Sequence, residues 1–166
     1  YISYLLTPAT VCLAVPLYRQ LTLLRKNLKA VIIGIVSGVL ASMVSVLVFA
    51  KLFGLSHSQY VTLLPKSITT AIGMGVSEEA GGIVTMTIVS IIITGILGNI
   101  VADGWFKLIG MKEPIAKGLA LGTSAHAIGT AKALELGEVE GAMSSLSIAV
   151  AGLMTVVSVP IMSGFI

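Results

Sequence analysis

Three long stretches of the chain are apolar and carry no charged residue. They comprise residues 30–50, 83–102 and 141–166. About 20 apolar residues, each rising ~1.5 Å in a helix, are enough to cross a hydrocarbon layer of ~30 Å. A helix also satisfies its own backbone hydrogen bonds, which lipid requires. The pattern therefore predicts three whole transmembrane helices.

Three other apolar stretches are interrupted by proline, glycine and charge. They comprise residues 1–18, 60–82 and 118–141. Proline and glycine at this density interrupt a regular helix, and irregular backbone persists at membrane depth only inside protein or beside a water-filled cavity. We expect these stretches to be broken or re-entrant helices around a site. The expected helix breaks are Pro8, Pro16, Pro65, Gly73, Gly122 and Gly129.

Short matches within the chain indicate internal repeats. The Ala-Ile-Gly at residues 71–73 recurs at residues 127–129, and the same offset of 56 relates Glu79 to Glu135. Each unit would consist of one broken element followed by one whole span. The predicted fold is all-α: a polytopic integral membrane protein, formed as one domain over residues 1–166, in which whole helices alternate with broken or re-entrant ones.

Composition and charge agree with this fold. The chain is 56% hydrophobic and only 10% charged, with a mean hydropathy of +1.06, whereas a soluble domain carries about 25% charged residues. Basic residues gather at positions 19–29 and 107–117. Both clusters are expected in the cytoplasm, which requires residues 60–82 to re-enter without a net crossing. We expect no nucleic-acid partner, because the net charge of +3 forms no basic patch with aromatic residues.

The first candidate site lies at residues 64–70. If Pro65 occupies the first turn of a helix, then Ser67, Thr69 and Thr70 lie near a helix amino terminus, where free backbone N–H groups attract carboxylates. Lys66 adds a full positive charge, so the segment suits a small anion. The alternative is that Lys66 extends to the membrane surface and the hydroxyl groups bond to their own helix.

The second candidate site lies at residues 122–130. Thr123, Ser124 and Thr130 offer hydroxyl groups to a ligand, and His126 titrates near neutral pH. In an apolar segment His126 could bind substrate or carry a proton, with Glu79 as a second candidate for proton coupling. A lone histidine can instead be a structural hydrogen-bond partner, and the glutamates can be solvated residues at helix ends. We find no nucleophile motif, metal-ligand spacing or phosphate loop, and expect no enzyme activity, metal or cofactor.

Four segments resemble the LrgB family. They are PATVCLAVPLY at residues 8–18, LPKSITT at 64–70, PIAKGLALGTSAH at 114–126 and ELGEVE at 135–140. The family includes CidB-type bacterial proteins and the membrane part of the plastid glycolate/glycerate translocator. The resemblance covers nearly the whole chain. Members are usually longer at the amino terminus, so we expect further spans upstream.

The resemblance implies two different activities. Bacterial relatives are described as antiholin-like regulators of murein hydrolase activity and cell lysis that act with a small LrgA/CidA-type membrane partner. The plastid relative exchanges glycolate and glycerate, and some bacterial relatives are linked to pyruvate movement. The broken helices and polar residues favour a carrier of small monocarboxylates, with a proton as the candidate coupling ion, in a homo-oligomer in the bacterial plasma membrane. The antiholin-like regulator is the alternative, followed by a structural subunit of a larger complex.

Overall fold

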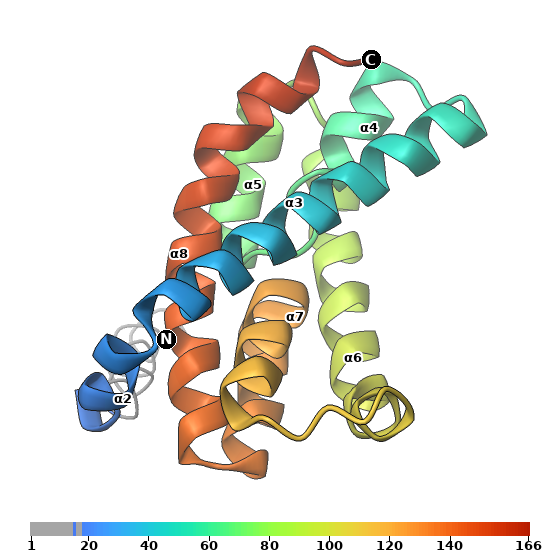
Figure 1. Ribbon diagram of the computed structural model, residues 1–166. Helices are drawn as coiled ribbons and strands as arrows, with labels where there is room; N and C mark the ends of the chain where they lie inside the picture. Colours follow the sequence, from blue (N-terminus) through green and yellow to red (C-terminus); the bar gives the residue numbers. More distant parts are fainter. Residues whose placement is uncertain (1–14, 16–17) are drawn as a thin grey trace, which may run out of the picture.

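The computed structural model describes residue 15 and residues 18–166. This part of the chain is helical and contains no strand, which confirms the all-α prediction. The expected breaks at Pro8 and Pro16 lie outside the described residues. The helices are α2 (Leu21–Lys26), α3 (Leu28–Phe53), α4 (His57–Leu63), α5 (Thr70–Glu79), α6 (Val84–Leu108), α7 (Pro114–Leu136) and α8 (Glu138–Ser163) (Figure 1).

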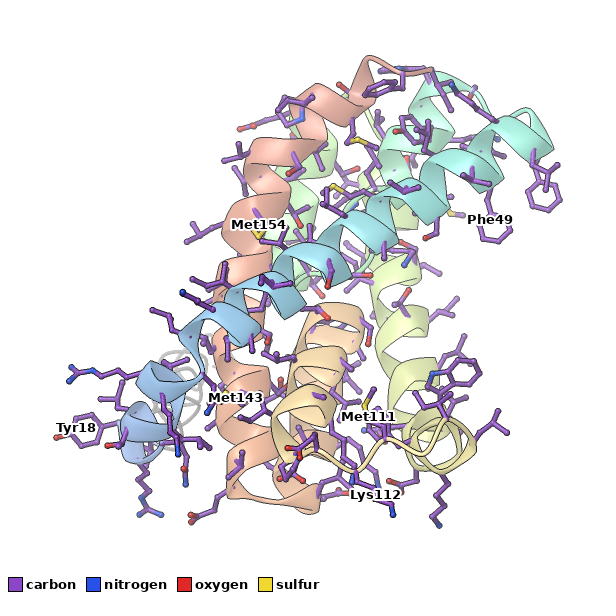
Figure 2. All side chains as sticks on the ribbon, viewed as in Figure 1. Tyr18, Phe49, Met111, Lys112, Met143 and Met154 are labelled. Atoms are coloured by element: carbon purple, nitrogen blue, oxygen red, sulfur yellow. The ribbon has the colours of Figure 1, made fainter. Side chains whose placement is uncertain are left out.

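Within residues 18–166, three helices, α3, α6 and α8, are long and apolar enough to cross a membrane. They contain the three charge-free stretches apart from residue 83 and residues 164–166, so the prediction of a polytopic membrane protein is confirmed. Large apolar side chains on all three helices are exposed, as expected for surfaces that contact lipid. Phe49 on α3 stacks on Phe53 with ring centroids 6.2 Å apart and points away from the other helices (Figure 2).

Helices α4 and α5 form a hairpin, hereafter the first hairpin. The Ser58 hydroxyl donates to the main-chain oxygen of Gly81 over 3.2 Å, and the Ile83 amide donates to Thr62 Oγ1 over 2.8 Å. The two ends of the segment therefore lie on the same side of the protein. This confirms the prediction that residues 60–82 fold back instead of crossing the membrane. The tip of the hairpin is the non-helical stretch 64–69, which contains Pro65.

Helix α7 is a second hairpin, because the chain reverses at His126 (φ 43°, ψ −132°). A Cβ atom placed on Gly129 would lie 2.6 Å from the main-chain oxygen of Leu121, eight residues earlier, so the two halves lie against each other. Gly118 in the first half packs against Glu140 at the start of α8. Both ends of the second hairpin therefore lie beside the start of α8, whereas the first hairpin begins and ends at the opposite end of the protein (Figure 1).

The breaks expected at Gly73, Gly122 and Gly129 are wrong, because all three glycines lie inside helices. They permit close helix contacts instead. A Cβ atom on Gly73 would lie 2.5 Å from Ile91 Cδ1, and one on Gly122 would lie 2.5 Å from the main-chain oxygen of Ser144. Small residues at such crossings let membrane helices pack closely. Pro65 does not lie in the first turn of a helix, contrary to the prediction from the sequence, since α5 begins only at Thr70.

The two hairpins have the order that the internal repeat predicts, each being followed by a whole span. An offset of 56 relates Thr70, the first residue of α5, to His126 at the reversal of α7. The same offset relates Val84, the first residue of α6, to Glu140 in the first turn of α8. Because the hairpins enter from opposite ends, the two units have inverted orientations, as in many membrane proteins built from repeats.

One end of the protein holds most of the basic residues. Arg19 Nη1 lies 3.5 Å from Glu138 Oε1, which places the first basic cluster beside the α7–α8 turn and at the same end as the α6–α7 loop. The other end holds Lys51, Glu78 and Glu79, at the ends of α3 and α5. Positive charge marks the cytoplasmic side of membrane proteins, so we call the first of these the cytoplasmic end.

Candidate functional site

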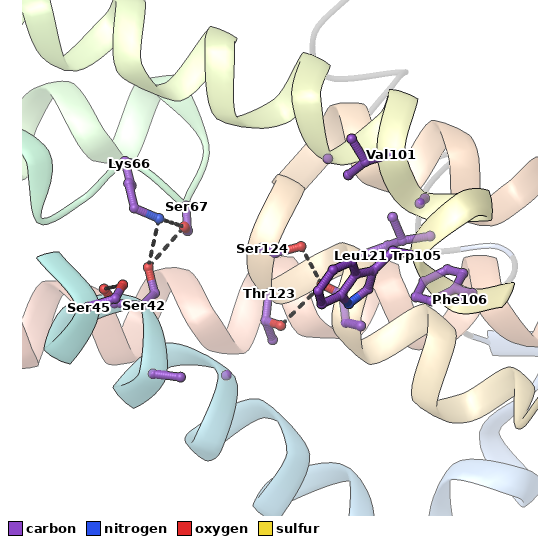
Figure 3. Close-up of a pocket in the computed structure, with 15 residues that line it drawn as sticks. Ser42, Ser45, Lys66, Ser67, Val101, Trp105, Phe106, Leu121, Thr123 and Ser124 are labelled. Carbon is purple, nitrogen blue, oxygen red and sulfur yellow. Dashed lines mark hydrogen bonds between the residues drawn. The ribbon is translucent and has the colours of Figure 1, made fainter. Parts of the chain in front are cut away.

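The tips of the two hairpins meet at one cavity, hereafter the central cavity. Its volume is about 480 Å³, and α3 and α6 form its other walls. Lys66 and Ser67 reach it from the tip of the first hairpin, and Thr123 and Ser124 reach it from the second (Figure 3). The structure therefore brings together four of the residues that the sequence singled out, from segments more than 50 positions apart.

The Lys66 ammonium group is the charged feature of the central cavity. Its Nζ donates to Ser42 Oγ over 3.2 Å and to Ser67 Oγ over 3.1 Å, and these two hydroxyl groups lie 3.0 Å apart (Figure 3). None of the described carboxylates lies within 4 Å of this nitrogen. Lys66 is half-buried, and a charge withdrawn from water without a counter-charge is costly in a membrane protein. A bound anion would remove that cost.

The hydroxyl groups on the facing hairpin are bonded to their own helix. Thr123 Oγ1 donates to the main-chain oxygen of Leu119 over 2.8 Å, and Ser124 Oγ donates to that of Ala120 over 2.6 Å. In this arrangement they present lone pairs to the cavity and not protons. Lys66 is therefore the main hydrogen-bond donor available to an anion, and Thr123 and Ser124 contribute donors only if their hydroxyl groups rotate.

Neither His126, at the reversal of the second hairpin, nor Thr130, one turn after it, lines the central cavity. The His126 ring is buried against α6, where Nε2 donates to the main-chain oxygen of Ile91 over 2.9 Å. Thr130 Oγ1 donates to the main-chain oxygen of His126 over 3.0 Å and lies 2.7 Å from Ser144 Oγ. Both side chains thus have structural hydrogen bonds, and their predicted contact with a substrate requires the second tip to move.

The remaining predicted site residues are also away from the central cavity. Thr69 is the N-cap of α5 but makes no capping bond with its side chain, and Thr70 is the first residue of that helix. Glu79 is exposed at the last position of α5, at the opposite end of the helix from the tip. Of the predicted site residues, the structure therefore places Lys66, Ser67, Thr123 and Ser124 at the central cavity and the others away from it.

The wall residues that were not assigned to the site from the sequence include two serines and a tryptophan. Ser42 and Ser45 come from α3, and Trp105 comes from α6. In the sequence, Ser42 follows Gly38 by four positions and Gly38 follows Gly34 by four, and small residues at this spacing indicate close helix packing. That packing is present, because a Cβ atom on Gly38 would lie 2.7 Å from Thr123 Oγ1. The close approach of α3 to the second hairpin brings Ser42 to Lys66.

Comparison with known proteins identifies the same family by two routes, a family model and individual relatives. The sequence model of the LrgB-like family matches residues 1–165. Proteins from Bacillus mycoides, Bacillus cereus and Bacillus anthracis, each named antiholin-like protein LrgB, are 41% identical to the chain over 165 residues. These matches cover 99% of the chain and 72% of each relative. No solved structure matches.

Proposed function

The chain belongs to the LrgB-like family, and from this membership we propose that it is an antiholin-like regulator in the bacterial cell membrane. The observation that carries the proposal is the 41% identity, over 99% of the chain, to proteins named antiholin-like. These names favour the regulator over the carrier that the polar residues suggested. The carrier stays a prediction.

A regulator of this kind acts by associating with other proteins in the plane of the membrane. Support comes from the exposed apolar side chains on α3, α6 and α8, which could contact a second membrane protein in place of lipid. A small LrgA-type protein is the proposed partner, and self-association into a homo-oligomer is a further part of the proposal. In either assembly, the partner would contact side chains such as Ile33, Ile100 and Leu153, which are about 70% exposed.

Dye release tests the regulator. Liposomes loaded with a fluorescent dye would receive the LrgA-type partner alone, this protein alone, or both, and the same combinations would be expressed in bacteria to follow the onset of lysis. We expect this protein to change leakage and lysis only in the presence of the partner. Lys66→Gln is the matched variant, because assembly through outer faces does not need the central cavity. Leakage that ignores the partner would contradict the proposal.

A second candidate, a carrier of small monocarboxylates such as pyruvate or glycolate, is favoured by one observation. The Lys66 ammonium group, which has no carboxylate partner among the described residues, lies in a cavity between two hairpins that enter from opposite ends of the protein. If the two hairpins moved alternately, the central cavity would open first to one side of the membrane and then to the other. A proton moving with the anion is part of this candidate.

Uptake of labelled pyruvate into proteoliposomes tests the carrier. We expect saturable uptake by the wild type, a large loss in Lys66→Gln, and partial activity in Lys66→Arg, which keeps the charge. His126→Ala and Thr70→Val test the predicted roles of these residues, and an imposed pH gradient tests the coupling ion. Equal, non-saturable flux through the wild type and Lys66→Gln would eliminate this candidate and leave the regulator unaffected.

A further inference from the structure

A second cavity lies at the cytoplasmic end, where α6 ends and α7 begins. It has a volume of about 410 Å³ and is hereafter the cytoplasmic cavity. The loop that forms its mouth has a fixed shape. Gly110 adopts a positive φ of 65°, and the Met111 amide donates to the main-chain oxygen of Phe106 over 2.9 Å. This bond closes the carboxyl end of α6 and turns the chain toward α7.

Three lysines line the cytoplasmic cavity: Lys107 in the last turn of α6, Lys112 in the loop and Lys117 in the first turn of α7. Lys107 and Lys112 are exposed, and Lys117 is half-buried. Lys112 extends from the α6–α7 loop beside Met111 (Figure 2). Among the described carboxylates, none lies within 4 Å of these three ammonium groups.

The acidic residue in the wall does not cancel this charge. Asp103 Oδ2 lies 2.9 Å from Lys132 Nζ, which also lies 3.3 Å from Glu135 Oε2. These three residues sum to a charge of −1, whereas the three lysines of the cavity sum to +3. Glu113, which follows Lys112 in the same loop, adds one more negative charge. The cavity and its immediate surroundings therefore keep a charge of +1, which an anionic ligand would neutralise.

The other wall residues are apolar. Phe106, Met111 and Leu136 line the same cavity as the lysines. The cavity also lies where the apolar span α6 reaches the membrane surface, next to Trp105, which is 57% exposed. Tryptophan of this kind marks the level of the lipid headgroups. Positive charge over an apolar floor at this depth suits a ligand that has a phosphate group attached to acyl chains.

We propose that the cytoplasmic cavity binds the phosphate group of an anionic phospholipid from the inner leaflet. Lys107, Lys112 and Lys117 contact the phosphate, and Phe106, Met111 and Leu136 contact the glycerol and upper acyl region. Basic pockets between membrane helices on the cytoplasmic side bind such headgroups. The site shares the wall residue Phe106 with the central cavity but none of that cavity's polar residues, and it does not depend on either proposed activity. A free phosphate ion shares the chemistry, and the experiment distinguishes the two sources.

Trp105 provides the measurement, because it is the single tryptophan of the chain and adjoins Phe106 and Lys107. The protein would be reconstituted into phosphatidylcholine nanodiscs containing increasing fractions of phosphatidylglycerol with brominated acyl chains, which quench nearby tryptophan. Brominated phosphatidylcholine gives the reference for non-specific contact. We expect half-maximal quenching at a markedly lower mole fraction of phosphatidylglycerol than of phosphatidylcholine.

Matched charge variants separate the cavity from a general attraction to basic surfaces. The double variant Lys107→Gln/Lys112→Gln should raise the half-maximal fraction of phosphatidylglycerol more than tenfold, at roughly fivefold for each lysine. Lys26→Gln/Lys29→Gln removes the same charge from exposed positions at the same end and should change it far less. Lys107→Arg/Lys112→Arg should keep the preference.

The proposal is overturned if phosphatidylglycerol and phosphatidylcholine quench equally, or if both glutamine double variants lose the same amount. Inorganic phosphate supplies the last comparison. If it restores Trp105 fluorescence in the presence of brominated phosphatidylglycerol, the site takes a free phosphate ion and the lipid assignment is wrong. If it has no effect while the cavity variant loses the preference, the lipid is the ligand.

Discussion

The Nε2 atom of His126 donates a hydrogen bond to the main-chain oxygen of Ile91 over 2.9 Å. His126 is also the one residue other than glycine, within the described part of the chain, that has a positive φ. Such a conformation costs a non-glycine residue about 1–3 kcal/mol and persists only when surrounding contacts hold it. We infer that the bond from His126 to α6 keeps the chain reversed at the second tip.

Two substitutions at His126 separate the ring from the backbone. His126→Ala should lower the free energy of unfolding by about 2–3 kcal/mol, because the buried oxygen of Ile91 loses its extra donor and a void remains. His126→Gly loses the same ring but relieves the positive φ, so it should be more stable than His126→Ala by about 1 kcal/mol. In an ordinary helix the order is reversed. Thermal unfolding in detergent would decide between the two orders.

Gly95 forms the other side of this contact. A Cβ atom there would lie 2.8 Å from His126 Cε1 and 2.8 Å from Ile128 Cδ1. Gly95→Ala should therefore destabilise the protein by about 1–3 kcal/mol, the usual cost of overpacking. Gly104→Ala on the same helix is the control, since a Cβ atom there has no neighbour within 4 Å. Equal unfolding midpoints for the two variants would show that the ring moves aside freely.

Lys66→Met tests whether the ammonium group of the central cavity lacks a fixed counter-charge. Without added anion, we expect the free energy of unfolding of Lys66→Met to stay within about 1 kcal/mol of the wild type or to be higher, because methionine removes an uncompensated charge. Adding pyruvate should stabilise the wild type and Lys66→Arg but not Lys66→Met. A large loss of stability in Lys66→Met without any anion would mean that a partner for the lysine is already in place.

Cysteine labelling tests the inverted hairpins. In a Cys12→Ser background, a membrane-impermeant maleimide should label His57→Cys and Glu79→Cys from outside intact cells, because both ends of the first hairpin lie on the same side. Lys112→Cys and Glu135→Cys, at the cytoplasmic end, should react only after permeabilisation. If the cysteines at positions 57 and 79 reacted from opposite sides, the α4–α5 segment would have to cross the membrane.

The whole spans could be predicted because lipid imposes their pattern directly. The charge-free stretch of residues 30–50 lies within α3 (Leu28–Phe53), which extends past it by two to three residues at each end. The re-entry of residues 60–82 also followed from the sequence, since the two basic clusters could share one side only in that way. Both inferences depend on composition and charge, which are local properties of the chain.

The second reversal could not be found in this way. Gly122 and Gly129 are the better local candidates for a break, yet the chain turns at His126, whose conformation is held by Ile91 on another helix. The same limit applies to the central cavity. Lys66 and Ser67 were predicted, but Ser42 meets them only because α3 crosses over the second hairpin. Contacts between distant segments decided both features.

Each hairpin has a side-chain hydrogen bond to the span that follows it, which has a consequence for biogenesis. Thr87 on α6 donates to Ser77 Oγ over 2.6 Å, and Ser144 on α8 lies 2.7 Å from Thr130 Oγ1. A hairpin that left the translocon before its span was synthesised would expose unpaired polar groups to lipid. Co-translational insertion should therefore proceed in two steps, with α4–α5 retained until α6 emerges and α7 retained until α8 emerges.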